Sequence, residues 1–238
     1  MTAEALAESV GVDPKTVQRW LTEGVKPHAR HQRLAAECLD REIGDLWDVP
    51  PAGPGLNGSA VPDAREEIVA AWAHRADAPR QEWRDLLDGG RARIDLLGYA
   101  MQFLPEDHVN LCDLLIEKAS RSCGVRIALA DPDSAVVAAR DAEEGLGGTM
   151  PHRIRTTLVH MRSLTSCAGI EVRYHATPMY NSIFRVDDAM FVTPHLFALP
   201  GFQAPLLHVR RAHNGGLFDN LVGHFERIWA TTTPIAPG

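Results

Sequence analysis

A stretch rich in proline and glycine, residues 49–63, divides this chain into two parts with different sequence patterns. It holds prolines at positions 50, 51, 54 and 62 and glycines at 53, 55 and 58, and it lacks a periodic apolar face. This composition is typical of a linker between domains. Apolar residues recur only at helical spacing before it, whereas strand and helix patterns alternate further on. The sequence therefore predicts a helical domain over residues 1–48 and a larger α/β region after the linker.

The composition excludes several classes of protein. The 238 residues are 45% hydrophobic and 23% charged, and no run approaches the roughly 20 apolar residues that a membrane helix needs. A basic and then apolar signal pattern is absent, so we expect a cytoplasmic protein. The net charge of −7 argues against nucleic-acid binding by the whole surface, so any contact with nucleic acid must come from a local patch. The four scattered cysteines lack metal-site spacing and are expected to be buried thiols. No cofactor or metal is expected.

Residues 3–23 have the pattern of two short helices joined by a tight turn. Their apolar positions are Leu6, Ala7 and Val10 in the first helix and Val17, Trp20 and Leu21 in the second. Gly11 suits the positive φ at a helix end, Asp13 is a natural N-cap, and Pro14 is a natural first helical residue. Over about residues 2–47 this pattern is similar to the helix-turn-helix of the Xre/Cro class of bacterial regulators. Domains of that class normally begin with another helix, which favours a true start upstream of Met1.

The resemblance implies that the second helix reads DNA. The candidate DNA-binding residues are Lys15, Thr16, Gln18, Arg19, Lys26, His28 and Arg30. Arginine and glutamine suit base edges, whereas lysine and threonine reach the backbone. The alternative interpretation is a solvated helix face. Residues 1–48 carry six Lys or Arg against nine Asp or Glu, which predicts modest non-specific affinity and strong salt sensitivity. The implied partner is a double-stranded DNA operator, an inverted repeat read by a homodimer.

The rest of the chain has a clear order of expected elements. A third helix is predicted over residues 31–46, with Trp47 closing the small core, and connecting helices over 64–74 and 79–87 lie within a 64–90 connection. Strands are predicted at 93–100, 125–129, 170–175, 181–186, 189–193 and 205–210, and helices at 105–123, 135–144, 152–167 and 217–229. Residues 145–149 form a glycine-rich loop that is too loose for a nucleotide fingerprint.

Residues 180–188, Tyr-Asn-Ser-Ile-Phe-Arg-Val-Asp-Asp, resemble a degenerate His-x-Lys-x-x-x-x-Asp motif of the phospholipase D superfamily. Tyr180 stands at the His position, Ser182 at the Lys position and Asp187 at the Asp position. The order of strands and helices over about residues 91–230 adds to this resemblance. It implies a phospholipase D-like α/β/α sandwich with a mixed sheet over residues 91–232, followed by a tail at 233–238. With the helical domain, the fold class is α+β multidomain.

In that superfamily the His attacks phosphorus and the Lys neutralises the phosphate charge. A phenol such as Tyr180 is a poor nucleophile because its ordinary pKa is near 10, and Ser182 brings no positive charge. We therefore expect a catalytically inactive domain, with Asp187 acting as a turn residue. The domain would serve ligand sensing, dimerisation or both. The alternative function is a phosphodiesterase or nuclease tethered to DNA.

A ligand pocket is expected where the strand ends meet. Its candidate residues are Tyr180, Ser182, Asp187, His175, Arg155 and Arg162. Arg155 and Arg162 are seven residues apart, so on one helix they would share a face with which to bind an acidic small molecule. The alternative is a solvated basic helix. His195 and His208 are also expected near the pocket, although a lone histidine is more often a structural residue than a metal ligand.

Overall fold

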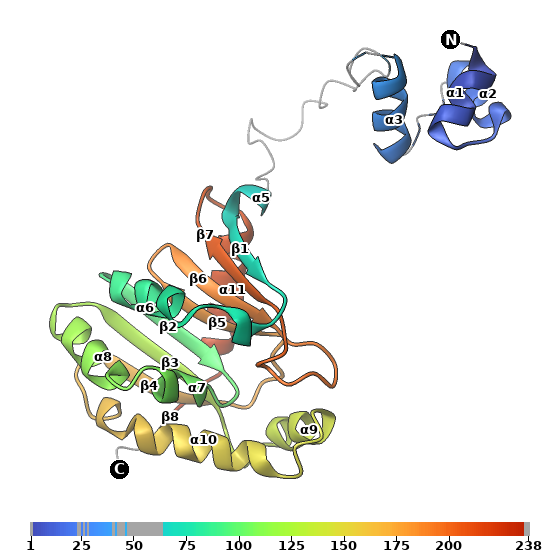
Figure 1. Ribbon diagram of the computed structural model, residues 1–238. Coiled ribbons are helices and arrows are strands. Elements are labelled where there is room, and N and C mark those ends of the chain that lie inside the picture. Colours follow the sequence, from blue (N-terminus) through green and yellow to red (C-terminus); the bar gives the residue numbers. More distant parts are fainter. Residues whose placement is uncertain are drawn as a thin grey trace. The chain divides into compact units, whose positions relative to one another are not determined.

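The computed structural model describes residues 2–22, 25, 27, 29–39, 41, 46 and 64–235 (Figure 1). The chain forms two compact units, Met1–Ser59 and Ala60–Gly238. The linker predicted at 49–63 and the core role predicted for Trp47 lie outside the described residues. The two units are therefore described separately.

The first unit contains three described helices, α1 (Ala3–Val10), α2 (Pro14–Thr22) and α3 (Ala29–Leu39). The predicted tight turn between α1 and α2 is confirmed. Gly11 has a φ of 74° and donates to the carbonyls of Ala7 and Glu8, and the Asp13 carboxylate accepts the Lys15 backbone N–H at 2.8 Å. These bonds end one helix and begin the next within three residues.

A small apolar core holds these helices together. Val17 and Ala35 are fully buried, Ala7 is nearly so, and the Trp20 ring stacks on His31 with centroids 6.2 Å apart. The third helix was predicted over residues 31–46; α3 covers Ala29–Leu39 and residue 41 is not helical, whereas residues 40 and 42–45 lie outside the described residues. The Arg41 backbone N–H donates to the carbonyl of Ala36 at 3.1 Å, the bond that closes a helix C-terminus.

The second unit is built on one eight-stranded mixed sheet in the order β1-β7-β6-β5-β2-β3-β4-β8. The strands are β1 (Ile68–Trp72), β2 (Arg93–Gly98), β3 (Gly124–Ala130), β4 (Ile170–His175), β5 (Asn181–Val186), β6 (Ala189–Pro194), β7 (Leu206–Arg210) and β8 (Thr233–Pro234). Strands β2, β3 and β4 are parallel and the other pairs are antiparallel. The predicted β5–β6 hairpin around residues 187–188 is confirmed.

Helices cover both faces of this sheet (Figure 1). They are α5 (Ala64–Glu67), α6 (Arg80–Gly89), α7 (Phe103–Asp107), α8 (Leu111–Ser120), α9 (Ala135–Glu143), α10 (Thr149–His160) and α11 (Leu217–Trp229), with 3-10 turns η1 (Arg75–Asp77) and η2 (Arg162–Leu164). Side chains alternate along a strand, so neighbours enter different cores. Leu97 packs in one cluster with Phe218 and Phe225 of α11, whereas Leu96 packs in the other with Trp83 of α6.

The prediction of a helix over residues 64–74 is wrong. Only α5 is helical, and β1 then forms an edge strand that pairs antiparallel with β7. The fully buried carboxylate of Glu67 marks the change, because it accepts the backbone N–H groups of Leu217 and Phe218 at the start of α11. Pairing with a distant strand thus overrides the local helical spacing of Ile68, Val69 and Trp72.

Three further elements differ from the prediction. The helix expected over 105–123 is two helices, α7 and α8, interrupted at residues 108–110. The helix expected over 152–167 begins earlier and ends at His160, followed by η2. The expected tail contains β8, which pairs with β4 and so extends the sheet.

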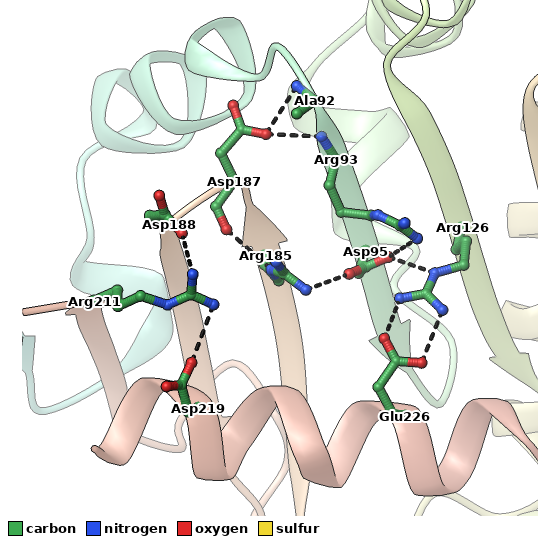
Figure 2. Close-up of polar contacts among 10 residues, drawn as sticks. All are labelled: Ala92, Arg93, Asp95, Arg126, Arg185, Asp187, Asp188, Arg211, Asp219 and Glu226. Carbon is green, nitrogen blue, oxygen red and sulfur yellow. Dashed lines mark hydrogen bonds and ion pairs between the residues drawn. The ribbon is translucent and has the colours of Figure 1, made fainter. Parts of the chain in front are cut away.

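A charged network ties α11 to the sheet (Figure 2). Fully buried Asp95 on β2 accepts hydrogen bonds from Arg126 at 2.7 Å and Arg185 at 3.1 Å. Arg126 also forms a two-point contact with Glu226 of α11, and its guanidinium lies over the Phe225 ring. A buried carboxylate is tolerated here because these two guanidinium groups, with that of Arg93 at 4.0 Å, compensate its charge.

Asp187 at the β5–β6 turn binds the chain rather than a site (Figure 2). Its carboxylate accepts the backbone N–H groups of Arg91, Ala92 and Arg93 at 2.8, 2.9 and 2.7 Å. The residue itself has a φ of 50°, a left-handed conformation that aspartate tolerates. Partial burial raises the pKa of this carboxyl, but the three N–H donors and Arg185 outweigh it, so the pKa is lowered. The predicted turn role is confirmed.

Candidate functional site

Helix α2 presents a polar face away from the small core. Lys15, Gln18 and Arg19 are exposed and Thr16 is half-buried, whereas Val17 between them is fully buried. The two candidate residues Lys26 and His28 lie outside the described residues, as does the side chain of Arg30. The helix therefore offers four neighbouring polar side chains on a rigid support.

The second unit contains a pocket of about 480 Å³ beside the carboxyl end of β2. Gly98, the last residue of β2, leaves space for the Met101 side chain, because a Cβ at position 98 would lie 2.4 Å from it. Met101 lines the pocket and has a φ of 51°. A side chain at position 98 would push this strained residue into the cavity, so the glycine helps to keep the pocket open.

Ser182 and His195 line the pocket and form a hydrogen-bonded pair. The Ser182 Oγ lies 2.9 Å from the His195 Nε2, and the His195 ring stacks on Tyr99 with centroids 5.3 Å apart. Burial, followed by the positive charge of Arg140, lowers the pKa of His195 to about 4. The imidazole is therefore neutral near pH 7, and its low basicity makes it a weak general base.

Two guanidinium groups line the same pocket. Arg75 donates from its Nε to the Gly201 carbonyl at 3.1 Å and lies 3.7 Å from the centre of the Phe103 ring. Burial lowers the pKa of Arg75 to about 10, partly offset by Asp107, so the group stays charged at neutral pH. Arg153 projects from α10 and is exposed. Within the described residues, neither arginine forms an ion pair at 4.0 Å or less.

The two carboxylates of the pocket have polar partners of their own. Glu144 pairs with Arg140 at 2.6 Å, and burial raises its pKa. Glu106 accepts a hydrogen bond from Gln102 at 2.7 Å. Among the described residues, Glu144 is thus the one charged group of the lining with an ion pair within 4.0 Å, whereas Arg75, Arg153 and Glu106 have none.

Two buried polar atoms in the lining have no hydrogen-bond partner among the described residues. They are the Oγ1 of Thr193, whose residue is 2% exposed, and the Nδ1 of His195. Thr193 stands opposite Ser182 in the β5–β6 hairpin, so the two hydroxyl groups belong to adjacent strands. Leaving buried polar groups unpaired costs free energy, and such groups are uncommon in folded proteins.

A second hollow of about 450 Å³ shares Tyr99 and His195 with the first. Its lining includes Tyr180 and Arg140, but the guanidinium of Arg140 is occupied. It binds Glu143, Glu144 and the carbonyls of residues 196 and 199. Because this arginine is engaged by the chain itself, the second hollow offers a ligand fewer polar groups than the first.

The family described as Domain of unknown function (DUF5919) matches residues 65–236. The chain belongs to this family. The match spans the α/β unit from α5 to β8, so the sheet, both helical layers and the pocket all lie within the DUF5919 domain. No curated protein sequence matches the chain.

Two solved structures resemble the chain distantly. TrmBL2, an archaeal chromatin protein described with a novel mode of DNA binding, is 13% identical, with 94% of this chain and 72% of that chain covered and a TM-score of 0.46. NucT from Helicobacter pylori is 12% identical, with 66% of this chain and 92% of that chain covered and a TM-score of 0.42. Similarities this distant carry no conclusion about function.

The structure separates the residues of the degenerate motif. Tyr180 lines the second hollow and is 71% exposed, Ser182 lines the first pocket, and Asp187 lies at the opposite end of β5. His175 lines neither hollow; it is buried, with its ring nitrogens 3.2 Å from the Thr177 carbonyl and 3.4 Å from that of Gly98. His208 packs its ring edge-on against Phe191. Only Ser182 and His195 come together in the first pocket.

The predicted pair of arginines on one helix face is wrong. Arg155 lies on α10 and pairs with exposed Asp133 at 2.6 Å, whereas Arg162 belongs to η2 because α10 ends at His160. Arg153, two residues before Arg155, reaches the pocket instead. Arg75 and Thr193 were not among the sequence candidates. Arg75 follows a segment expected to be helical, and the strand that actually positions it depends on distant pairing.

Two negative findings apply to the described part of the chain. No group of three or more His, Cys, Asp or Glu side chains there is arranged to hold a metal ion. None of its helices is both long and apolar enough to span a membrane.

Proposed function

We propose that this protein is a sequence-specific DNA-binding transcriptional regulator whose DUF5919 domain binds a ligand or a second copy of the chain without hydrolysing a substrate. The polar face of α2 carries the proposal. Lys15, Gln18 and Arg19 are exposed on a helix whose register is fixed by buried Val17. Arginine and glutamine on an outward helix face suit hydrogen bonding to base edges in the major groove.

The geometry of the α1–α2 connection supports this proposal. Gly11 in the left-handed conformation and the Asp13 cap join two short helices through a tight turn, and Ala7 and Val17 pack in their shared core. A helix-turn-helix needs such a turn and such small and apolar residues at the helix contact. Assignment to the Xre/Cro class is part of the proposal.

A homodimer that reads an inverted repeat completes the proposal. One recognition helix reads one half-site, so two-fold pairing doubles the contact. The DUF5919 domain exposes large apolar side chains beside its two hollows: Tyr180, Leu196, Phe197 and Phe202 are 71%, 45%, 87% and 49% exposed. Exposed apolar side chains gathered in one region favour a protein partner. Sedimentation of the full chain at micromolar concentration without DNA should show a dimer, and a monomer would contradict this part.

The absence of hydrolysis is also proposed on chemical grounds. Tyr180, at the nucleophile position of the degenerate motif, is exposed, and Asp187 is engaged by the backbone at the far end of the strand. A nucleophile needs a base in contact and a third group that orients the base. Tyr180 and Asp187 supply neither arrangement among the described residues.

One observation favours a second candidate function, a hydrolase. The Ser182 hydroxyl and the His195 imidazole are 2.9 Å apart in a pocket with two arginines, which is the spacing of a nucleophile and its base. The Nδ1 of His195 lacks an orienting partner within the described residues, and its pKa of about 4 weakens it as a base. The regulator is therefore the better-supported candidate.

Selection of genomic DNA fragments on the full-length protein tests the regulator. We expect the selection to enrich an inverted repeat. Arg19→Ala and Gln18→Ala should each bind this repeat about 1–3 kcal/mol more weakly and should discriminate less between bases. Lys15→Ala should weaken binding to all sequences alike, since it removes a backbone contact. The charge-matched control Arg121→Ala changes an exposed arginine that directly follows α8 and should bind as wild type. Recovery of no preferred sequence, or footprints of both variants equal to wild type, would rule out α2 as the reading helix.

A further inference from the structure

We infer that the 480 Å³ pocket of the DUF5919 domain is a binding site for a small organic acid with an aromatic body, held by Arg75, Arg153 and Thr193. The inference deepens the proposed function. It rests on that proposal in one respect, namely that the domain binds a ligand without hydrolysing it. Nothing in the degenerate motif itself assigns these three residues.

The charge of the pocket selects an anion. Arg75 and Arg153 have no ion-pair partner within 4.0 Å among the described residues, and Glu144 is paired with Arg140. Glu106 is bound only to the neutral amide of Gln102, so the two arginines outnumber the one lining carboxylate that has no arginine partner. A guanidinium held over an aromatic ring, as Arg75 is over Phe103, is pre-organised for a carboxylate or phosphate because its planar fork is fixed. Its Nε already donates to the Gly201 carbonyl, so the terminal nitrogens remain for the ligand.

A buried hydroxyl supplies an independent indication of a ligand. The Oγ1 of Thr193 is unpaired among the described residues, although the residue is only 2% exposed and lines the pocket. A valine would fill the same space without an unsatisfied polar atom. An oxygen of a bound acid would accept a hydrogen bond from this hydroxyl and remove the cost of leaving it unpaired.

The walls of the pocket indicate an aromatic body on the acid. Phe103, Phe184, Met101 and Met150 line it, and half-exposed Phe202 lies at the same pocket. A volume of about 480 Å³ falls within the range of small-molecule sites and exceeds what a bare phosphate fills. Methionine and phenylalanine side chains contact aromatic rings favourably. The lining thus combines two arginines with apolar and aromatic walls.

Calorimetric titration of the full-length protein with four probes tests the inference. Phenyl phosphate and benzoate carry both features, whereas benzamide lacks the charge and inorganic phosphate lacks the ring. At least one aryl acid should bind, and its matching single-feature probe should bind about tenfold more weakly or worse. Benzamide loses the charge-assisted hydrogen bonds, and inorganic phosphate loses the apolar contacts of the ring. No binding of either aryl acid at millimolar concentration, or equal binding of benzamide and benzoate, would overturn the inference.

Matched variants locate the bound acid. Arg153→Gln changes an exposed residue of α10 and should weaken the aryl acid about tenfold or more. The control Arg155→Gln, two residues further along the same helix, pairs with Asp133 outside the pocket and should leave affinity unchanged. Thr193→Val should weaken binding severalfold while keeping the fold, since it preserves shape. Wild-type affinity in both Arg153→Gln and Thr193→Val would place the ligand elsewhere and reject this site.

DNA binding measured on the same samples separates this inference from the proposed function. Aryl-acid binding without a preferred DNA sequence would reject the regulator and retain the pocket. Sequence-specific DNA binding without aryl-acid binding would retain the regulator and reject the pocket.

Discussion

The two ends of strand β5 treat polar groups in opposite ways. At the turn end, Asp187 binds three backbone N–H groups, and neighbouring Arg185 and Asp95 belong to the network that reaches α11 (Figure 2). At the other end, Ser182 lies in a pocket where Thr193 and His195 retain buried atoms without partners among the described residues. Both ends belong to one hairpin, yet polar atoms are matched at one end and left unmatched at the other.

This difference distinguishes polar groups that stabilise the fold from polar groups that are available to a ligand. Where every donor and acceptor is matched, removing one side chain leaves its partners unsatisfied and destabilises the protein. Where a polar atom is already unmatched, removing it relieves a cost. Substitutions at the two ends should therefore change stability in opposite directions.

The largest effect is expected from the centre of the matched network. Asp95→Asn removes a fully buried charge and leaves Arg126 and Arg185 undercompensated, which should lower the free energy of unfolding by about 3–5 kcal/mol. Urea unfolding followed by circular dichroism measures this loss. The control Glu226→Gln removes the half-exposed carboxylate of the same network and should cost only about 1 kcal/mol. Equal effects of the two substitutions would show that burial does not set the cost.

A smaller loss is expected at the hairpin turn. Asp187→Asn keeps a side chain that tolerates a φ of 50° but replaces one of the two accepting oxygens by a donor. The free energy of unfolding should therefore fall by about 2 kcal/mol at pH 7. Because the folded-state pKa of Asp187 is lowered, its stabilisation is fully present above the ordinary pKa of about 4 and is lost as pH falls through the folded value.

The difference between wild type and Asp187→Asn should therefore shrink as the solution is acidified below about pH 4. Asp188→Asn serves as the matched control, because the exposed side chain of this neighbour forms an ion pair with Arg211 at 2.9 Å and the substitution should change stability by less than about 1 kcal/mol. A pH-independent loss at position 187 would mean that shape, and not charge, matters at the turn.

At the pocket end the expected change has the opposite sign. Thr193→Val removes an unpaired buried hydroxyl and keeps the side-chain shape, so the free energy of unfolding should rise by about 1 kcal/mol. The control Thr157→Val removes an equally buried hydroxyl that donates to the Arg153 carbonyl at 2.9 Å, and it should lower stability by about 1 kcal/mol. Thermal unfolding without added ligand measures both. A loss at position 193 comparable to that at 157 would remove the contrast between the two ends.

Local sequence patterns predicted many elements of the DUF5919 domain. The apolar spacing of residues 217–229 predicted α11 at its observed bounds, and the alternation on either side of residues 187–188 predicted the β5–β6 hairpin. Both signals are local, since one depends on a helical repeat and the other on a turn. Strand β1 was missed because its pairing with β7 joins residues far apart in the sequence.

The site was less predictable than the fold for the same reason. Ser182 and His195 meet because β5 and β6 pair in one register. The sequence predicted that both residues lie near the pocket, but it did not predict their contact. A basic helix was expected near the pocket, but the sequence did not show that Arg153 rather than Arg155 would line it, because this depends on how α10 packs. Arg75 is positioned by β1 and by the carbonyl of Gly201, and neither contact leaves a local signal.

The smallest expected effect concerns catalysis at the pocket end. We predict that bis-aryl phosphodiester, DNA and phospholipid are hydrolysed only at the background rate, and that Ser182→Ala and Tyr180→Phe change nothing. A base must carry the proton of its nucleophile, but the pKa of His195 is lowered to about 4, so its imidazole gains little by accepting one near pH 7. Histidine nitrogen shifts followed by NMR should show His195 titrating near pH 4. Turnover above background that Ser182→Ala or His195→Gln abolishes would make the pair catalytic, and the unpaired atoms of the pocket would then belong to a substrate site.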